Sequence, residues 1–211
     1  MRISYTVTVY NELKELKTLL PLLEQIRTDP NDEIIIVHTF REEKEKFTDI
    51  DTQIREYAYP IADQYVRYHF DKKFADMKNF TNNLATKDYI INFDADEFAS
   101  IDTINSWKEA INNNNDLYHL PRVNTVKNYT LDDVKQYGWN INNNGWINWP
   151  DYQPRIYKNN GKIKWVGNVH EQLTGFENAA ALPANPRYAI IHHKDIEKQR
   201  TQNTLYETIQ R

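Results

Sequence analysis

The chain has 211 residues, of which 40% are hydrophobic and 27% are charged, and its formal net charge is −4. These values are ordinary for one globular domain with a substantial core, and the lack of a basic excess argues against nucleic acid as a partner. Because the sequence contains no cysteine, structural disulfides and thiolate metal sites are excluded.

Strands and helices alternate in the predicted first half. Residues 2–10 have the β-branched and aromatic content of a strand, Asn11 is expected to cap a helix that reaches Ile26, and residues 33–40 form a buried strand. This β-α-β order predicts parallel strands and a right-handed crossover. The elements that follow are a weakly helical segment (41–61), a strand (63–70), a helix (74–87) and a strand (88–94). The alternation predicts an α/β layer fold.

The second half is predicted to be less regular. A long segment, 127–153, is aromatic and punctuated by glycine, and we predict a loop there. Long loops in compact domains are usually functional or disordered, and the tryptophans argue against disorder. The other predicted elements are a helix (102–111), a strand (116–126), a hairpin that turns on Asn160-Gly161 (154–167), a strand (188–195) and a closing helix (196–211). Neither an internal repeat nor an interdomain linker is recognisable, so we expect one domain over residues 1–211.

Two aspartates follow the fourth predicted strand in the stretch YIINFDADEF. Asp94 and Asp96 are two positions apart, so their side chains face the same side of an extended segment. Ligands of open α/β sheets bind beyond the carboxyl ends of the strands, and carboxylates suit Mg²⁺ or Mn²⁺ shared with substrate phosphates. The motif alone is weak evidence, because it recurs at 49–51 and a turn or helix-capping acid is the better explanation of an isolated motif. Phosphatases of the haloacid dehalogenase type place such a motif after the first strand instead.

Four segments together are more specific than the aspartates. They resemble family 2 glycosyltransferases with the GT-A fold, including small bacterial members that decorate the lipopolysaccharide core. The segments are YTVTVYNE (5–12), FADMKNFTNNLATKDYIINFDADEF (74–98), QPRIYKNNGKIKWVGNVHEQL (153–173) and IIHHKDIEKQRTQN (190–203). The resemblance covers most of the chain in order, and the segment 127–153 is its loosest part. It implies a mostly parallel central sheet flanked by helices, with a nucleotide-sugar-binding half (1–100) and an acceptor-binding half (101–211).

By this resemblance, the protein would move a sugar, with inversion, from a nucleotide-diphosphate donor to a hydroxyl of a glycan, lipid-linked or other acceptor. A UDP-sugar is the default donor. Asp94 and Asp96 would hold Mn²⁺ or Mg²⁺, which neutralises the charge that grows on the leaving nucleotide. His170 and His192 are the candidate histidine ligands, although each is equally explained as a structural imidazole. Further donor-side candidates are Tyr10, Asn11, Glu12, His38, Lys78, Asn79, Asp94 and Arg155.

An inverting transfer needs a base that takes the proton of the acceptor hydroxyl. The resemblance places Glu171 in that role, whereas the structural alternative is an ion pair with Arg155. Lys78 is a candidate phosphate contact or an ordinary solvated helix lysine. Sugar rings pack their C–H faces on indole, so an aromatic cluster is expected on the acceptor side unless it only fills the core. The cluster consists of Trp139, Trp146, Trp149, Tyr152 and Trp165.

The sequence departs from the family pattern after the second strand. Family members carry an aspartate there, which contacts the donor base or ribose, and this chain has His38 and lacks the glycines that follow. This difference leaves nucleotide recognition open. It also keeps open a carbohydrate-binding or degenerate protein without turnover. A nucleotidyltransferase is a third alternative, but such enzymes usually carry a glycine-rich basic loop after the first strand, which is missing here.

No apolar run approaches the ~20 residues that span a bilayer, and the N-terminus lacks the features of a signal peptide. We therefore expect no transmembrane segment and a cytoplasmic enzyme, peripheral at the inner membrane face where its acceptor is lipid-linked. Because the last predicted helix includes Arg211, the sequence leaves open whether the chain continues.

Overall fold

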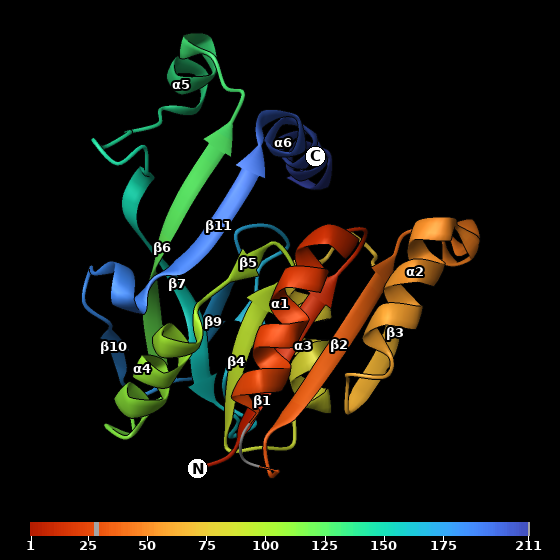
Figure 1. Cartoon of the computed structure of the whole chain (residues 1–211), viewed down its shortest axis with the longest axis vertical. Helices are drawn as coiled ribbons and strands as arrows, with labels where there is room; N and C mark the ends of the chain where they lie inside the picture. Colours follow the sequence, from red (N-terminus) through yellow and green to blue (C-terminus); the bar gives the residue numbers. More distant parts are fainter. Residues whose placement is uncertain (28–29, 211) are drawn as a thin grey trace.

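The structure, a computed structural model, describes residues 1–27 and 30–210, and nine strands form its central sheet (Figure 1). The order along the sheet is β3-β2-β1-β4-β7-β6-β11-β5, with β10 paired beside β6; β8 and β9 form a second, two-stranded sheet. The strands are β1 (Ile3–Val9), β2 (Glu33–Phe40), β3 (Gln64–His69), β4 (Tyr89–Asp94), β5 (Glu97–Phe98), β6 (Leu117–Lys127), β7 (Ile147–Lys158), β8 (Lys164–Val166), β9 (Gln172–Thr174), β10 (Ala179–Ala181) and β11 (Ile190–Asp195).

Helices cover both faces of the sheet (Figure 1). The α-helices are α1 (Leu13–Ile26), α2 (Asp49–Ala58), α3 (Phe74–Leu84), α4 (Ile101–Ile111), α5 (Leu131–Tyr137) and α6 (Ile196–Gln210), and the 3₁₀ helices are η1 (Glu43–Phe47) and η2 (Pro186–Tyr188). The predicted closing helix extended to Arg211, which lies outside the described residues. Within the part of the chain that is described, no helix is both long and apolar enough to cross a bilayer.

The parallel pairing predicted for the first half is confirmed. Strand β1 pairs in parallel with β2 on one side and with β4 on the other, and β3 continues the sheet beyond β2. β2 is buried along its whole length, as expected for a strand with both faces covered. In the second half β7 is antiparallel to both β4 and β6, while β11 is parallel to β6. The carboxyl ends of β1, β4, β6 and β11 therefore meet at one edge.

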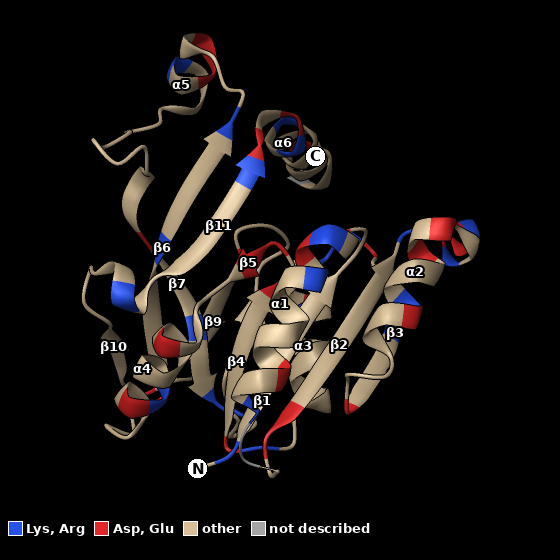
Figure 2. Cartoon of the chain, in the orientation of Figure 1, with Lys and Arg blue, Asp and Glu red and all other residues tan. Residues whose placement is uncertain are grey.

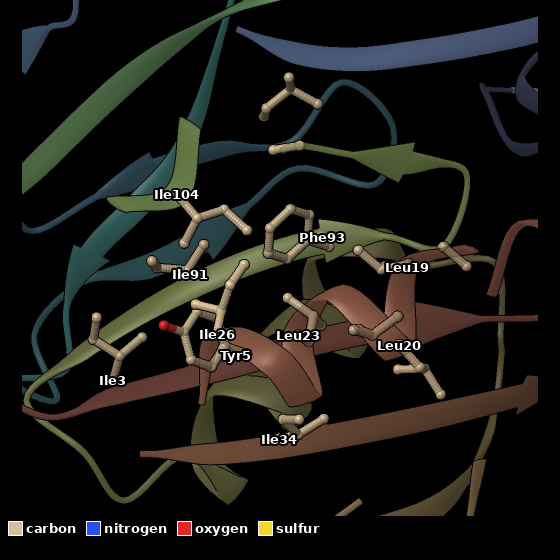
Figure 3. Packing of buried hydrophobic residues seen from close by; sticks show 14 of the residues in the cluster. Ile3, Tyr5, Leu19, Leu20, Leu23, Ile26, Ile34, Ile91, Phe93 and Ile104 are labelled. Carbon is tan, nitrogen blue, oxygen red and sulfur yellow. The ribbon is translucent and has the colours of Figure 1, made fainter. Parts of the chain in front are cut away.

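Alternate residues of the central strands supply the two cores. Tyr5, Ile91 and Phe93 face α1, α2 and α4, and the apolar stripe of α1 packs on them through Leu19 and Leu23 (Figure 3). The opposite face packs against α3 and the small β8–β9 sheet, in a smaller cluster of buried side chains. This cluster consists of Ala75, Ile90, Leu117, Tyr157, Ile163, Trp165 and Leu173.

Three local predictions are wrong. The segment predicted as a loop contains α5 and the start of β7, which pairs with β6 through two register shifts. The predicted hairpin does not form, because the chain leaves β7 at Lys158 and β8 pairs with β9 instead. Asn11 is not the helix cap: Glu12 occupies that position, and its carboxylate accepts hydrogen bonds from the backbone N–H groups of Tyr10 and Asn11.

The core predicts a large difference between two chemically identical substitutions. Leu19→Ala removes a fully buried side chain of α1, whereas Leu131→Ala truncates a side chain of α5 that is 77% exposed. We expect Leu19→Ala to lower the free energy of unfolding by about 2–5 kcal/mol. The matched control Leu131→Ala should stay within about 0.5 kcal/mol of the wild type. Urea unfolding followed by circular dichroism measures both, and equal losses would contradict this description of the core.

Candidate functional site

A cavity of about 920 Å³ opens at the edge where the carboxyl ends of β1, β4, β6 and β11 meet. Residues 8–12 at the end of β1, the acidic turn 94–96 after β4 and the start of α3 contribute to its wall, and α6 runs along it through Lys198 and Tyr206. Figure 1 shows α6 beside the ends of β6 and β11. The predicted location of the site, beyond the ends of the parallel strands, agrees with this cavity.

A buried charge network lies beneath the acidic turn. The carboxylate of Glu97, which is fully buried, accepts hydrogen bonds from Arg122 Nη1 at 2.9 Å and Arg155 Nη2 at 2.7 Å. The same Arg155 nitrogen lies 2.6 Å from Asp94 Oδ2. Burial works to raise the pKa of Asp94, but the charges of Arg155 and Lys78 outweigh it and lower the pKa to about 2. Asp94 is therefore an anion held by its own arginine.

Asp96 faces His192, and a hydrogen bond on the far side of the ring fixes the orientation of this histidine. Asn124 donates from Nδ2 to Asp151 at 2.8 Å, so its Oδ1 faces His192 Nδ1, also at 2.8 Å. His192 then carries its proton on Nδ1, and burial lowers its pKa and favours the neutral ring. The remaining lone pair, on Nε2, lies 3.4 Å from Asp96 Oδ2.

Two acceptors that face each other in this way attract a cation. In the structure the ammonium of Lys198 supplies the charge, 3.1 Å from Asp96 Oδ2 and 3.5 Å from Glu12 Oε1. An imidazole oriented by a hydrogen bond on its far nitrogen, next to a carboxylate, is a typical donor set for a divalent metal. The residues thus fit a metal at Asp96 and His192, although no three histidine or acidic side chains converge on one point within the described residues.

The other two predicted metal ligands have different partners. Asp94 is held by Arg155. His170 lines the cavity and packs edge-on against the ring of Tyr206, with 5.6 Å between ring centroids.

Glu171, the predicted base, does not pair with Arg155. Its carboxylate contacts the Lys78 ammonium, and that ammonium also lies over the ring of Trp165, 4.3 Å from the ring centroid. Lys78 is buried, so it is not an ordinary solvated helix lysine. This pair and Trp165 all line the cavity.

The donor-side candidates divide into two groups. Tyr10, Asn11 and Glu12 line the cavity, whereas Asn79 and His38 do not. The side-chain amide of Asn79 brackets the backbone of Trp165, accepting from its N–H at 2.9 Å and donating to its carbonyl at 2.8 Å. Asn79 therefore holds β8 against α3.

His38 is buried behind the end of β1. Its Nε2 donates to the backbone carbonyl of Tyr10 at 3.1 Å, and its Nδ1 contacts the hydroxyl of Tyr65. Asp51 and Arg67 complete the cluster as an ion pair of 2.6 Å. The His38 side chain thus faces the protein interior and not the cavity.

The predicted aromatic cluster is also divided. Trp139 and Trp165 line the cavity. Trp146 and Trp149 pack on each other, with 5.0 Å between ring centroids, and the hydroxyl of Tyr152 donates to the carbonyl of Leu182 at 3.0 Å. These three residues are not among those that line the cavity.

Several charged residues of the site were not predicted. Arg122 and Asn124 lie two positions apart on β6 and point to the cavity, as Asp151 does from β7, and β11 and α6 add Lys194 and Lys198. The signal for the first pair was present, because polar residues alternate with apolar ones in the stretch LPRVNTV.

Comparison with protein-family models and with curated proteins gives no match. Among solved structures, S. aureus TarS 1–349 is similar over 99% of this chain and 64% of its own length, with 14% identity and a TM-score of 0.55. Its complex with UDP-GlcNAc matches over 62% and 37%, with 18% identity and a TM-score of 0.48. The mannosyltransferase PcManGT from Pyrobaculum calidifontis, in complex with GDP-Man and Mn²⁺, matches over 57% and 35%, with 19% identity and a TM-score of 0.45.

The likeness to TarS 1–349 over nearly the whole chain decides the architecture. The chain has the GT-A fold. The predicted fold class is thereby confirmed. The chain spans less than two thirds of the length of these structures.

The buried His38 predicts a pH dependence of stability. Burial, with the charge of Arg67, lowers its pKa to about 4, from about 6.5 in an unfolded chain. Below pH ~6.5 the unfolded state binds the proton more readily, so His38 contributes full stability above that pH and loses it as the pH falls toward 4. Between pH ~7.5 and ~5 the wild type should lose about 1–2 kcal/mol more than His38→Gln, as measured by urea unfolding. Equal losses would show that His38 is not kept neutral by the fold.

Proposed function

We propose that the protein is a metal-dependent, inverting glycosyltransferase that uses a nucleotide-diphosphate sugar. The observation that carries the proposal is Asp96 facing the oriented His192, at the carboxyl edge of a GT-A sheet and inside a cavity large enough for a nucleotide sugar. The similar structures include complexes with UDP-GlcNAc and with GDP-Man and Mn²⁺, which belong to those proteins. A UDP-sugar remains the default donor, and the acceptor hydroxyl belongs to a glycan or a lipid-linked molecule.

In this proposal Asp96 and His192 hold Mn²⁺ or Mg²⁺. When bound, the metal neutralises charge on the diphosphate that leaves. Asp94 stays with Arg155 and supports the turn that presents Asp96. In the sequence analysis Arg155 is a candidate for donor binding. We propose that this role is indirect, because its Nη2 is occupied by Glu97 and Asp94 and its Nη1 by Asn92.

Glu171 is the proposed base for the acceptor hydroxyl. Two other carboxylates of the cavity wall are less suited to take a proton. Despite burial, the charges of Arg155 and Lys78 lower the pKa of Asp94 to about 2, which makes it a weak base. Asp151 accepts hydrogen bonds from Arg122, Asn124 and Gln153 on both of its oxygens. Glu171 contacts Lys78 through one oxygen, which leaves the other oriented by no described hydrogen bond. We assign acceptor contact to Trp139 and Trp165, the two tryptophans of the cavity wall.

Ligand-induced stabilisation tests donor and metal together. Thermal unfolding is followed with UDP-, GDP-, CDP- and dTDP-sugars, with and without Mn²⁺, for the wild type, Asp96→Asn and the control Asp49→Asn. We expect one nucleotide to raise the unfolding temperature, and Mn²⁺ to increase that shift in the wild type and the control but not in Asp96→Asn. Asp49 is a suitable control because it is an exposed acid in the other Asp-x-Asp stretch.

Stabilisation by no nucleotide in either condition would overturn the proposed function. An Mn²⁺-dependent shift that survives in Asp96→Asn would remove Asp96 from the metal site. Binding of a sugar nucleotide without hydrolysis or transfer would favour the alternative of a binding protein without turnover.

Glu171→Gln tests the base. The substitution keeps the size of the side chain and removes its ability to accept a proton at neutral pH. We expect donor binding within about threefold of the wild type and a turnover reduced by about 10²–10⁴-fold, measured as release of nucleoside diphosphate from the donor found above. Glu177→Gln, at an exposed glutamate six residues further along, is the matched control and should keep full turnover. Unchanged turnover in Glu171→Gln would remove this residue from the role.

A further inference from the structure

The cations of the cavity wall differ in how they are neutralised. Six lysine and arginine side chains line the cavity: Arg41, Lys78, Arg122, Arg155, Lys194 and Lys198. Four of them form ion pairs with carboxylates within 4 Å. Over residues 1–27 and 30–210, neither Lys194 nor Arg41 forms such a pair, and Arg41 is an exposed residue at the rim, stacked over the ring of Tyr10.

Lys194 differs from Arg41 because it points into the site. It follows His192 by two positions on β11, so both side chains project from the same face of the strand, toward the acidic turn. Its ammonium donates a hydrogen bond to Gln202 Oε1 of α6, a neutral partner. In Figure 2 the blue of Lys and Arg appears near the end of β11, next to α6, which carries both blue and red residues.

The surroundings of Lys194 leave its charge uncompensated. Asp96 and Asp94 both act on it, but Asp96 already pairs with Lys198 and Asp94 with Arg155. In the proposed enzyme Asp96 also binds the metal. Arg122 and Lys198 add positive charge around the ammonium. A charge removed from water is stable only when an opposite charge accompanies it, so this arrangement favours an anion at Lys194.

We propose that Lys194 is a binding residue for the diphosphate group of the donor. The inference rests on the proposed function for the identity of the anion, and it replaces Lys78 as the phosphate contact, because Glu171 neutralises Lys78. An ammonium is a compact point charge that suits phosphate oxygens, and Gln202 orients it from α6.

Inorganic pyrophosphate is the probe, because it carries the diphosphate chemistry without a base or a sugar. Calorimetric titrations compare the wild type with Lys194→Met, Lys194→Arg and the control Lys127→Met, at constant ionic strength, with and without excess Mg²⁺. Lys127 is a suitable control because it is an exposed lysine at the end of the neighbouring strand β6, in register with Asp195. Inorganic phosphate and the nucleotide found above are titrated in parallel.

We expect Lys194→Met to weaken pyrophosphate about tenfold, Lys194→Arg to retain most of the affinity, and Lys127→Met to match the wild type. The nucleoside without phosphates should bind all four proteins equally. A Lys194→Met protein that binds pyrophosphate as tightly as Lys127→Met in both conditions would overturn the inference. Thermal unfolding shows whether Lys194→Met is folded. If it is not, Lys194→Gln replaces it as the variant without the charge, and its affinity for pyrophosphate is compared with that of Lys194→Arg in the same way.

The outcomes separate this inference from the proposed function. If pyrophosphate binding depends on Lys194 but no sugar nucleotide binds, the anion site stands and the glycosyltransferase proposal fails. If a sugar nucleotide binds and Lys194→Met leaves its affinity unchanged, the proposed function stands and the role of Lys194 fails. Absence of pyrophosphate binding to the wild type would also overturn the role.

Discussion

The site depends on one buried carboxylate, that of Glu97. This carboxylate is fully buried and accepts hydrogen bonds from Arg122 of β6 and Arg155 of β7. It therefore joins the acidic turn after β4 to these two paired strands. Without Glu97, two guanidinium groups would share a low-dielectric region without a common counter-charge, a costly arrangement. The same arginines hold Asp94 and Asp151, so this contact links the acids of the turn to that of β7 in one network.

This network divides the roles of the two aspartates. Asp94 is neutralised from within the protein by Arg155, whereas the partners of Asp96 come from the β11–α6 segment, where His192 and Lys198 face it. A carboxylate already held by a buried guanidinium is a poor competitor for a metal, because the metal must displace a charge-assisted hydrogen bond. The Asp-x-Asp motif therefore combines a residue that fixes the turn with a residue that remains available at the cavity.

Periodicity was sufficient for the first half of the fold, since long apolar runs and a clear helical stripe produced β1, α1, β2 and β4. It failed across 127–153, because tryptophans, asparagines and Pro150 conceal the start of β7, whose partner β6 is fixed only by long-range pairing. Of the residues that line the cavity, Asp94, Asp96, Glu171 and His192 were predicted from the sequence, whereas Asp151 was not. Lys194 and Lys198 were not predicted. Lys198 forms an ion pair with Asp96 whereas Lys194 bonds to the neutral Gln202, and this difference depends on tertiary packing, which the sequence pattern does not show.

His38 is a buried histidine that supports the cavity wall from behind the end of β1. Its ring donates to the Tyr10 carbonyl and contacts the Tyr65 hydroxyl, with Asp51 and Arg67 behind it. Both ring nitrogens have partners, so the neutral imidazole is stable in a buried position. It acts on the cavity through the backbone it holds, since Tyr10 and Glu12 at the end of β1 belong to the wall. His38 therefore supports the end of β1 from within the protein, and its side chain does not itself line the cavity.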